Sequence, residues 1–167
     1  PVEVLDTQLA RKLRAEKRRI DNATIYNINI VGADGESKSL VGGYSTIYKR
    51  LNDCQNIISR YDPILQDYMV SGQAPAGVDV YDIYRQYTEA YDAVEAILGD
   101  EKFLNDYDLV EQYWMLCDRA TAGHLELADA IRLFNSDVPM TLVINDGRMR
   151  LLEEGEVIPE EERMSDY

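Results

Sequence analysis

Ser45–Tyr61 reads STIYKRLNDCQNIISRY, and its apolar side chains recur at alternating intervals of four and three residues. This spacing places them on one face of an α-helix, where they can be buried together. Ser45 is a suitable N-cap for the helix. Asp62-Pro63 then forms a typical N-cap and first-turn pair, so a kink or a new helix is expected there. The apolar positions are Ile47, Leu51, Cys54, Ile58 and Tyr61.

Two later segments show the same helical spacing. Asp79 is expected to cap a helix that ends at Gly99. A longer helix is predicted over about 108–135, with Gly123 as the position at which it would bend. The apolar face of the first helix is Val80, Tyr84, Tyr87, Tyr91, Val94 and Leu98, and that of the second is Leu109, Tyr113, Leu116, Ala120, His124, Leu127, Ile131 and Phe134.

The N-terminal segment, about 4–22, is also predicted to be helical, with Asp6 placed to cap it. Its apolar stripe is narrow, so the helix buries little surface by itself. We expect it to lean on the rest of the chain or on a neighbouring molecule. The stripe consists of Leu5, Leu9, Leu13 and Ile20.

Two segments have the pattern of β-hairpins. In the first, at about 24–41, alternating residues surround the turn sequence Gly32-Ala33-Asp34-Gly35. In the second, at about 140–152, a two-residue turn at Asp146-Gly147 would place apolar residues opposite one another. The expected pairs are Ile144 with Met149 and Leu142 with Leu151, while Val143, Arg148 and Arg150 would share the other face.

These elements predict a mainly α fold with minor β structure: a bundle of three to four helices with two β-hairpins and an acidic C-terminal tail. The expected division is a basic N-terminal helical arm at 1–22, a helical domain with both hairpins at 23–152, and the tail at 153–167.

Charge is segregated along the chain, which has a net charge of −14. A polarised molecule of this kind can bind copies of itself head to tail, so we expect both charged segments to contact protein neighbours. The basic arm has no aromatic anchor, which argues against sequence-specific nucleic-acid binding. The expected interface residues are Arg11, Lys12, Arg14, Lys17, Arg18 and Arg19 in the arm, and Glu153, Glu154, Glu160, Glu161 and Glu162 in the tail.

Tyrosine dominates the aromatic residues, with 12 Tyr against two Phe and one Trp. Tyrosine buries apolar area and keeps a hydroxyl for a hydrogen bond, which suits contacts between proteins. Tyr84, Tyr87 and Tyr91 are expected to fill the core. Tyr81 lies off their face and is the predicted aromatic interface residue.

No residue pattern indicates catalysis, a metal or a cofactor, so none is expected. The single histidine, His124, lies on the predicted apolar face, seven residues from Cys117, and two helical turns are too far for a direct hydrogen bond. We expect His124 to be a buried residue with a hydrogen-bond partner. Three Cys and His residues are too few for an ordinary structural zinc site.

The expected cellular location depends on two features, the apolar segments of the sequence and the state of the cysteines. No apolar segment typical of a signal peptide or a membrane span occurs, and Cys54 and Cys117 are expected to be buried free thiols. We therefore expect a cytoplasmic protein without a membrane partner. For a viral protein, the location would be the host cytoplasm and the virion.

The expected function is that of a non-enzymatic structural protein, a subunit of a large complex containing copies of itself and other proteins. A bacteriophage particle component fits best, such as a head–tail connector, an adaptor or a minor capsid-associated protein. The alternative is an acidic inhibitor that mimics nucleic acid and occupies a DNA-binding protein. Its carboxylates would follow one face, as Asp79, Asp82, Glu89, Asp92 and Glu95 could. A small hydrolase with paired carboxylates ranks third.

Overall fold

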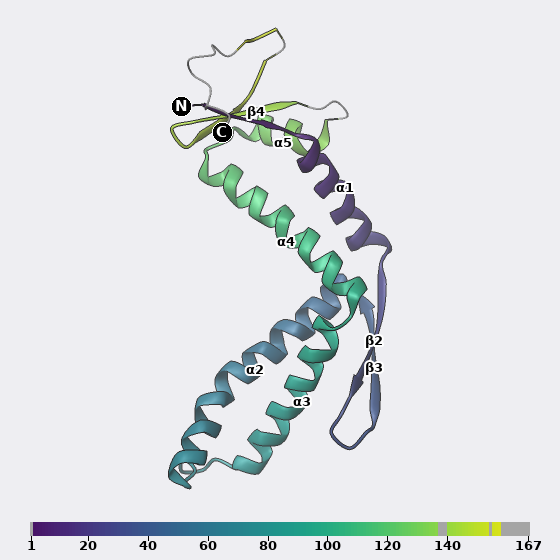
Figure 1. Ribbon diagram of the computed structural model, residues 1–167, viewed down its shortest axis with the longest axis vertical. Helices are drawn as coiled ribbons and strands as arrows, with labels where there is room; N and C mark the ends of the chain where they lie inside the picture. The colour runs from purple at the N-terminus through teal and green to yellow at the C-terminus, as the bar shows by residue number, and fades with distance from the viewer. Residues whose placement is uncertain (1, 137–139, 154, 158–167) are drawn as a thin grey trace, which may run out of the picture. The chain divides into compact units, whose positions relative to one another are not determined.

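A computed structural model describes residues 2–136, 140–153 and 155–157 (Figure 1). Within these residues the chain is mainly helical with minor β structure, as predicted, although it has five helices instead of three or four. In chain order the elements are β1 (Val2–Asp6), α1 (Gln8–Ala23), β2 (Ile25–Val31), β3 (Ser37–Gly43), α2 (Tyr44–Ser71), α3 (Val80–Leu98), α4 (Glu101–Ala122), α5 (Leu127–Asn135), β4 (Thr141–Asn145) and β5 (Arg148–Leu151).

The chain divides into two compact units. The central unit is Ile20–Asp106, and the terminal unit combines Pro1–Arg19 with Tyr107–Tyr167. The chain passes from one unit to the other within α1 and again within α4.

In the central unit, α2 and α3 lie side by side and are joined at one end by residues 72–79 (Figure 1). Small side chains are buried between them: Cys54, Ala90 and Ala93. Small residues let two helices approach closely, because little volume separates their backbones. A second part of this core is aromatic and consists of Tyr26, Tyr44 and Phe103.

The predicted interruption of α2 at Asp62-Pro63 is wrong, because α2 continues through Pro63 to Ser71. Asp62 accepts hydrogen bonds from Tyr87 of α3 at 3.3 Å and from Gln66 at 3.1 Å, so its carboxylate does not cap a new helix. Tertiary packing against α3 thus outweighs the local signal. The predicted cap at Ser45 is also wrong, since Gly43 is the N-cap and no side chain caps the helix.

The boundaries predicted for α3 are confirmed, but its buried face is not. The Asp79 side chain accepts hydrogen bonds from the backbone N–H groups of Tyr81 and Asp82, and Gly99 is the C-cap. The buried residues are Ile83, Ala90, Ala93 and Ile97, which lie on a different face from the predicted one. Tyr84 and Tyr91 are exposed, so the expectation that they fill the core is wrong.

The first β-hairpin forms as predicted, with β2 antiparallel to β3 in continuous register from Ile25↔Gly43 to Val31↔Ser37. Its turn combines two backbone hydrogen bonds, from Gly35 N–H to Gly32 C=O and from Gly32 N–H to Glu36 C=O. Gly35 has a φ of 80°, which glycine adopts without strain.

In the terminal unit, the predicted start of the N-terminal helix is wrong. Residues 2–6 form β1, which pairs antiparallel with β4, and α1 begins only at Gln8. Thr7 continues the pairing, because its N–H donates to the carbonyl of Met140 at 2.9 Å. The strand needs a partner more than 130 residues away, so the local pattern could not reveal it.

The predicted helix over 108–135 is in fact two helices. α4 starts earlier, at Glu101, and ends at Ala122, and α5 starts at Leu127. His124 has a φ of 54° between them, in the left-handed region. His124 is exposed, so the expectation that it is a buried, hydrogen-bonded core residue is wrong.

The second β-hairpin has the predicted register, Leu142↔Leu151 and Ile144↔Met149. Asp146 and Gly147 both have positive φ, as a two-residue hairpin turn requires. Val143 pairs with Arg150 on the other face, as predicted, and it is buried against Leu152. The hydrophobic core of the unit consists of Ala10, Ala120, Leu133, Leu142, Met149 and Leu151.

Candidate functional site

The outer end of the α2–α3 pair is the most exposed apolar region of the described residues. Met69 is 84% exposed, Val70 91% and Tyr81 82%. Asp79 is the single charged residue between Tyr68 and Tyr81, and it is used as the α3 cap. We call Met69, Val70 and Tyr81 the apolar tip. An exposed apolar region on a chain with 29% charged residues is typical of a protein contact surface.

Tyr81, the predicted aromatic interface residue, is thus placed in this tip by the Asp79 cap at the start of α3. Tyr84 and Tyr91 are exposed further along the same helix, whereas Tyr87 is half-buried and stacks on Tyr91 with ring centroids 6.3 Å apart. Desolvation and the nearby Asp62 carboxylate raise the pKa of Tyr87. The sequence signal for the tip is the charge-poor segment 68–78, whose composition by itself indicates only a loop.

The basic arm is part of the terminal unit up to Arg19, and its buried Leu13 and Ala10 anchor it there. Several of its cations have partners within the unit. The Lys17 ammonium lies 5.4 Å from the ring centroid of Tyr113 and 5.3 Å from that of Trp114. Desolvation raises the pKa of Tyr113, and the nearby Arg14 guanidinium opposes this rise.

The remaining four arm cations differ in exposure. Arg19 pairs with Glu16 at 2.9 Å, and Arg11 is half-buried. Lys12 and Arg18 are exposed, and no ion pair to either occurs within the described residues. These two are therefore the arm residues best placed to meet a neighbour.

The acidic tail is described only at its start. Glu153 lies 3.6 Å from the Arg132 guanidinium. The hydrogen bond from Arg150 to Glu156 lowers the pKa of that carboxyl. Glu154, Glu160, Glu161 and Glu162, predicted as interface residues, lie outside the described residues.

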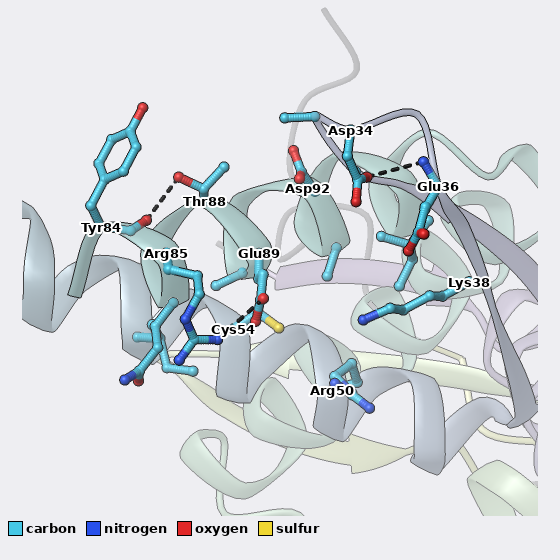
Figure 2. Close-up of a pocket in the computed structure, with 17 residues that line it drawn as sticks. Asp34, Glu36, Lys38, Arg50, Cys54, Tyr84, Arg85, Thr88, Glu89 and Asp92 are labelled. Carbon is cyan, nitrogen blue, oxygen red and sulfur yellow. Dashed lines mark hydrogen bonds and ion pairs between the residues drawn. The ribbon is translucent and has the colours of Figure 1, made fainter. Parts of the chain in front are cut away.

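A cleft of about 690 Å³ opens in the central unit between the β2–β3 turn and the helices α2 and α3 (Figure 2). Its lining carries both signs of charge. Figure 2 shows Arg85 and Glu89 joined on α3, with Lys38 extending toward the middle from β3. Arg85 also pairs with Asp82 at 2.6 Å. The charged lining residues are Asp34, Glu36, Lys38, Arg50, Arg85, Glu89 and Asp92.

Cys54 is the one thiol in this lining, and its surroundings do not activate it. Burial raises the pKa of the Cys54 thiol, and this effect exceeds the opposing influence of Arg50. A nucleophilic cysteine needs a lowered pKa, because the thiolate is the reactive form. Asp34 is occupied in the turn, where it accepts the Glu36 N–H at 3.0 Å. The geometry therefore supports a structural role for Cys54.

This environment predicts a difference in thiol reactivity. At about pH 8, iodoacetamide should modify half-buried Cys117 several-fold faster than Cys54, because Cys54 combines burial with a raised pKa. Mass spectrometry of tryptic peptides over time measures both rates. In concentrated guanidinium the rates should become equal, whereas rapid native modification of Cys54 would contradict the assignment.

Among the described residues, no group of three or more His, Cys, Asp or Glu side chains is arranged to hold a metal ion. No helix in the described part of the chain combines the length and apolarity needed to cross a bilayer. Comparison of the chain with protein families, with curated proteins and with solved structures found no match in any of the three.

Proposed function

We propose that this chain is a non-enzymatic structural subunit of an oligomeric assembly, whose partners are copies of itself and other protein subunits. The observation that carries the proposal is the apolar tip: Met69, Val70 and Tyr81 expose apolar surface where the chain has almost no charge. Burial of such apolar surface by a protein partner is favourable and stabilises the complex. Within this class we favour a bacteriophage head–tail connector, adaptor or minor capsid-associated protein, by analogy with other small helical ring subunits.

The arm supplies a second, electrostatic contact in this proposal. Exposed Lys12 and Arg18 would contact an acidic surface of a neighbouring subunit. Acidic surface is abundant on this chain because its net charge is −14. Contacts of this type weaken with salt, whereas burial of an apolar tip does not. The two contacts can therefore be separated experimentally.

The nucleic-acid mimic remains the second candidate, favoured by the line of acids on α3. Several of these acids have local roles, however. Asp79 caps the helix, and Asp82 and Glu89 both pair with Arg85. A cation inside the row interrupts the phosphate-like charge pattern that a mimic needs, so the assembly proposal has the stronger support.

The test is the native mass of the full chain by analytical ultracentrifugation. Wild-type protein should form species larger than a dimer, and Met69→Lys with Val70→Lys should abolish these larger species, because charge at the tip cannot be buried unpaired. The matched control is Gln55→Lys with Asn56→Lys, which places two lysines on exposed positions of the same helix. A wild-type chain that is monomeric at every concentration would falsify the proposal.

The arm is tested by charge reversal, since deletion would remove buried Leu13 and unfold the terminal unit. Lys12→Glu with Arg18→Glu should reproduce the effect of about 1 M salt on the wild-type mass distribution, because both remove the same exposed attraction. If the reversed variant assembles as the wild type does in low salt, the arm has no part in the assembly.

A further inference from the structure

β2 forms one edge of a two-stranded sheet. Within the described residues it pairs with β3 alone. The hydrogen bond from the Gly32 N–H to the Glu36 carbonyl, beside the turn, shows which residues of β2 direct their backbone groups toward β3. Even-numbered residues of β2 direct their N–H and C=O groups toward β3, so Ile25, Asn27, Asn29 and Val31 direct theirs away from it.

Proteins usually blunt such an edge with lysine, proline, a bulge or a covering segment. β2 reads IYNINIV and contains no charged residue, proline or glycine, and its register with β3 has no bulge. At one end the Ile25 carbonyl accepts a hydrogen bond from Lys102 at 3.2 Å. The outward backbone groups of Asn27, Asn29 and Val31 meet no second strand in the described chain.

The side chains of β2 are nearly palindromic about Ile28. Reversing the strand places Asn27 opposite Asn29 and Ile25 opposite Val31, so amides meet amides and apolar groups meet apolar groups. Each of these pairs has its backbone groups directed outward, which is the requirement for hydrogen bonding between antiparallel strands. All four side chains are exposed. A strand with this symmetry is complementary to itself under a two-fold axis.

We propose that two copies of this chain associate by antiparallel pairing of their β2 strands about a two-fold axis at Ile28, which joins the two hairpins into a four-stranded sheet. The net charge of −14 makes copies repel one another, and this edge brings together side chains without charge. The pairing goes beyond the proposed function: a two-fold contact closes after two copies, so larger assemblies need the tip or the arm in addition.

The test uses charge pairs that depend on the register. In Asn27→Asp with Asn29→Asp, each new carboxylate faces another across the axis, and the dimer dissociation constant should rise by about tenfold or more. In Asn27→Lys with Asn29→Asp, each lysine faces an aspartate of the other copy, and dimerisation should be retained. Ser39 donates to the Asn29 side chain at 3.2 Å, and a carboxylate at position 29 can still accept that bond.

The matched control is Ser37→Asp with Ser39→Asp, which adds the same charge to β3, one strand further from the proposed axis than Asn27 and Asn29. It should dimerise more tightly than the double aspartate variant of β2. Circular dichroism and thermal unfolding verify that every variant is folded.

Two results overturn the pairing: a wild-type chain that stays monomeric, or dimers to which both β2 variants respond alike. Larger species that are lost in the tip variant but unchanged in the β2 variants would contradict the β2 pairing and would still support the proposed function. Dimers that depend on the β2 charges, with no larger species in low salt, would support the pairing and remove the larger assembly.

Discussion

Replacing Phe103 with alanine should lower the free energy of unfolding of the central unit by about 3–5 kcal/mol. Phe103 is fully buried in the aromatic part of this core. Its ring stacks on Tyr44 with centroids 5.4 Å apart and meets Tyr26 edge to face at 5.5 Å. Truncation removes both ring contacts and leaves a cavity that rigid aromatic neighbours fill poorly.

A substitution at the adjacent residue serves as the control for this loss of stability. Leu104 is half-exposed on the same turn of α4, so Leu104→Ala should lower stability by only about 1 kcal/mol or less. Urea unfolding followed by circular dichroism reports the helices, while the fluorescence of Trp114, the single tryptophan, reports the terminal unit. Equal losses for Phe103→Ala and Leu104→Ala would contradict the assigned core.

Features that the sequence predicts correctly are local. The β4–β5 register follows from four apolar residues around Asp146-Gly147, and the ends of α3 follow from Asp79 and Gly99. In each case, residues close in sequence determine the geometry. Tyr81 is exposed, in agreement with its position off the apolar face predicted for this helix.

The structural features that could not be predicted from the sequence depend on residues far away along the chain. β1 exists because β4 offers an edge to it, and α2 passes through Pro63 because α3 packs along it. The buried face of α3 differs from the predicted one because small side chains, and not the large tyrosines, are buried there. Close packing of two helices selects the small residues Ala90 and Ala93, while Tyr84 and Tyr91 are exposed.

For the candidate interface residues too, the sequence predicts local features, whereas exposure and pairing depend on the fold. The charge of the arm is evident from sequence, but only the structure separates exposed Lys12 and Arg18 from Lys17, which lies over two aromatic rings. The open edge of β2 was likewise invisible, because the sequence predicts a strand without indicating how many neighbours it has.

Substituting Gly123 by alanine is the second large effect that we expect, with a loss of about 1–3 kcal/mol from the terminal unit. Gly123 is buried where α4 ends. An added Cβ would lie 2.6 Å from Met149 Cγ and 2.8 Å from its sulfur, well inside contact distance. The Met149 N–H donates to the Gly123 carbonyl at 2.8 Å, so β5 cannot withdraw without losing that hydrogen bond.

A double-mutant cycle isolates this collision from any general effect of alanine at the helix end. Met149→Ala alone should be destabilising, because Met149 belongs to the buried core. In its background, however, Gly123→Ala should cost much less than in the wild type, since the atoms that the new Cβ meets are gone. Trp114 fluorescence in urea measures all four proteins. An equal cost of Gly123→Ala in both backgrounds would show that close contact with Met149 is not what requires glycine at this position.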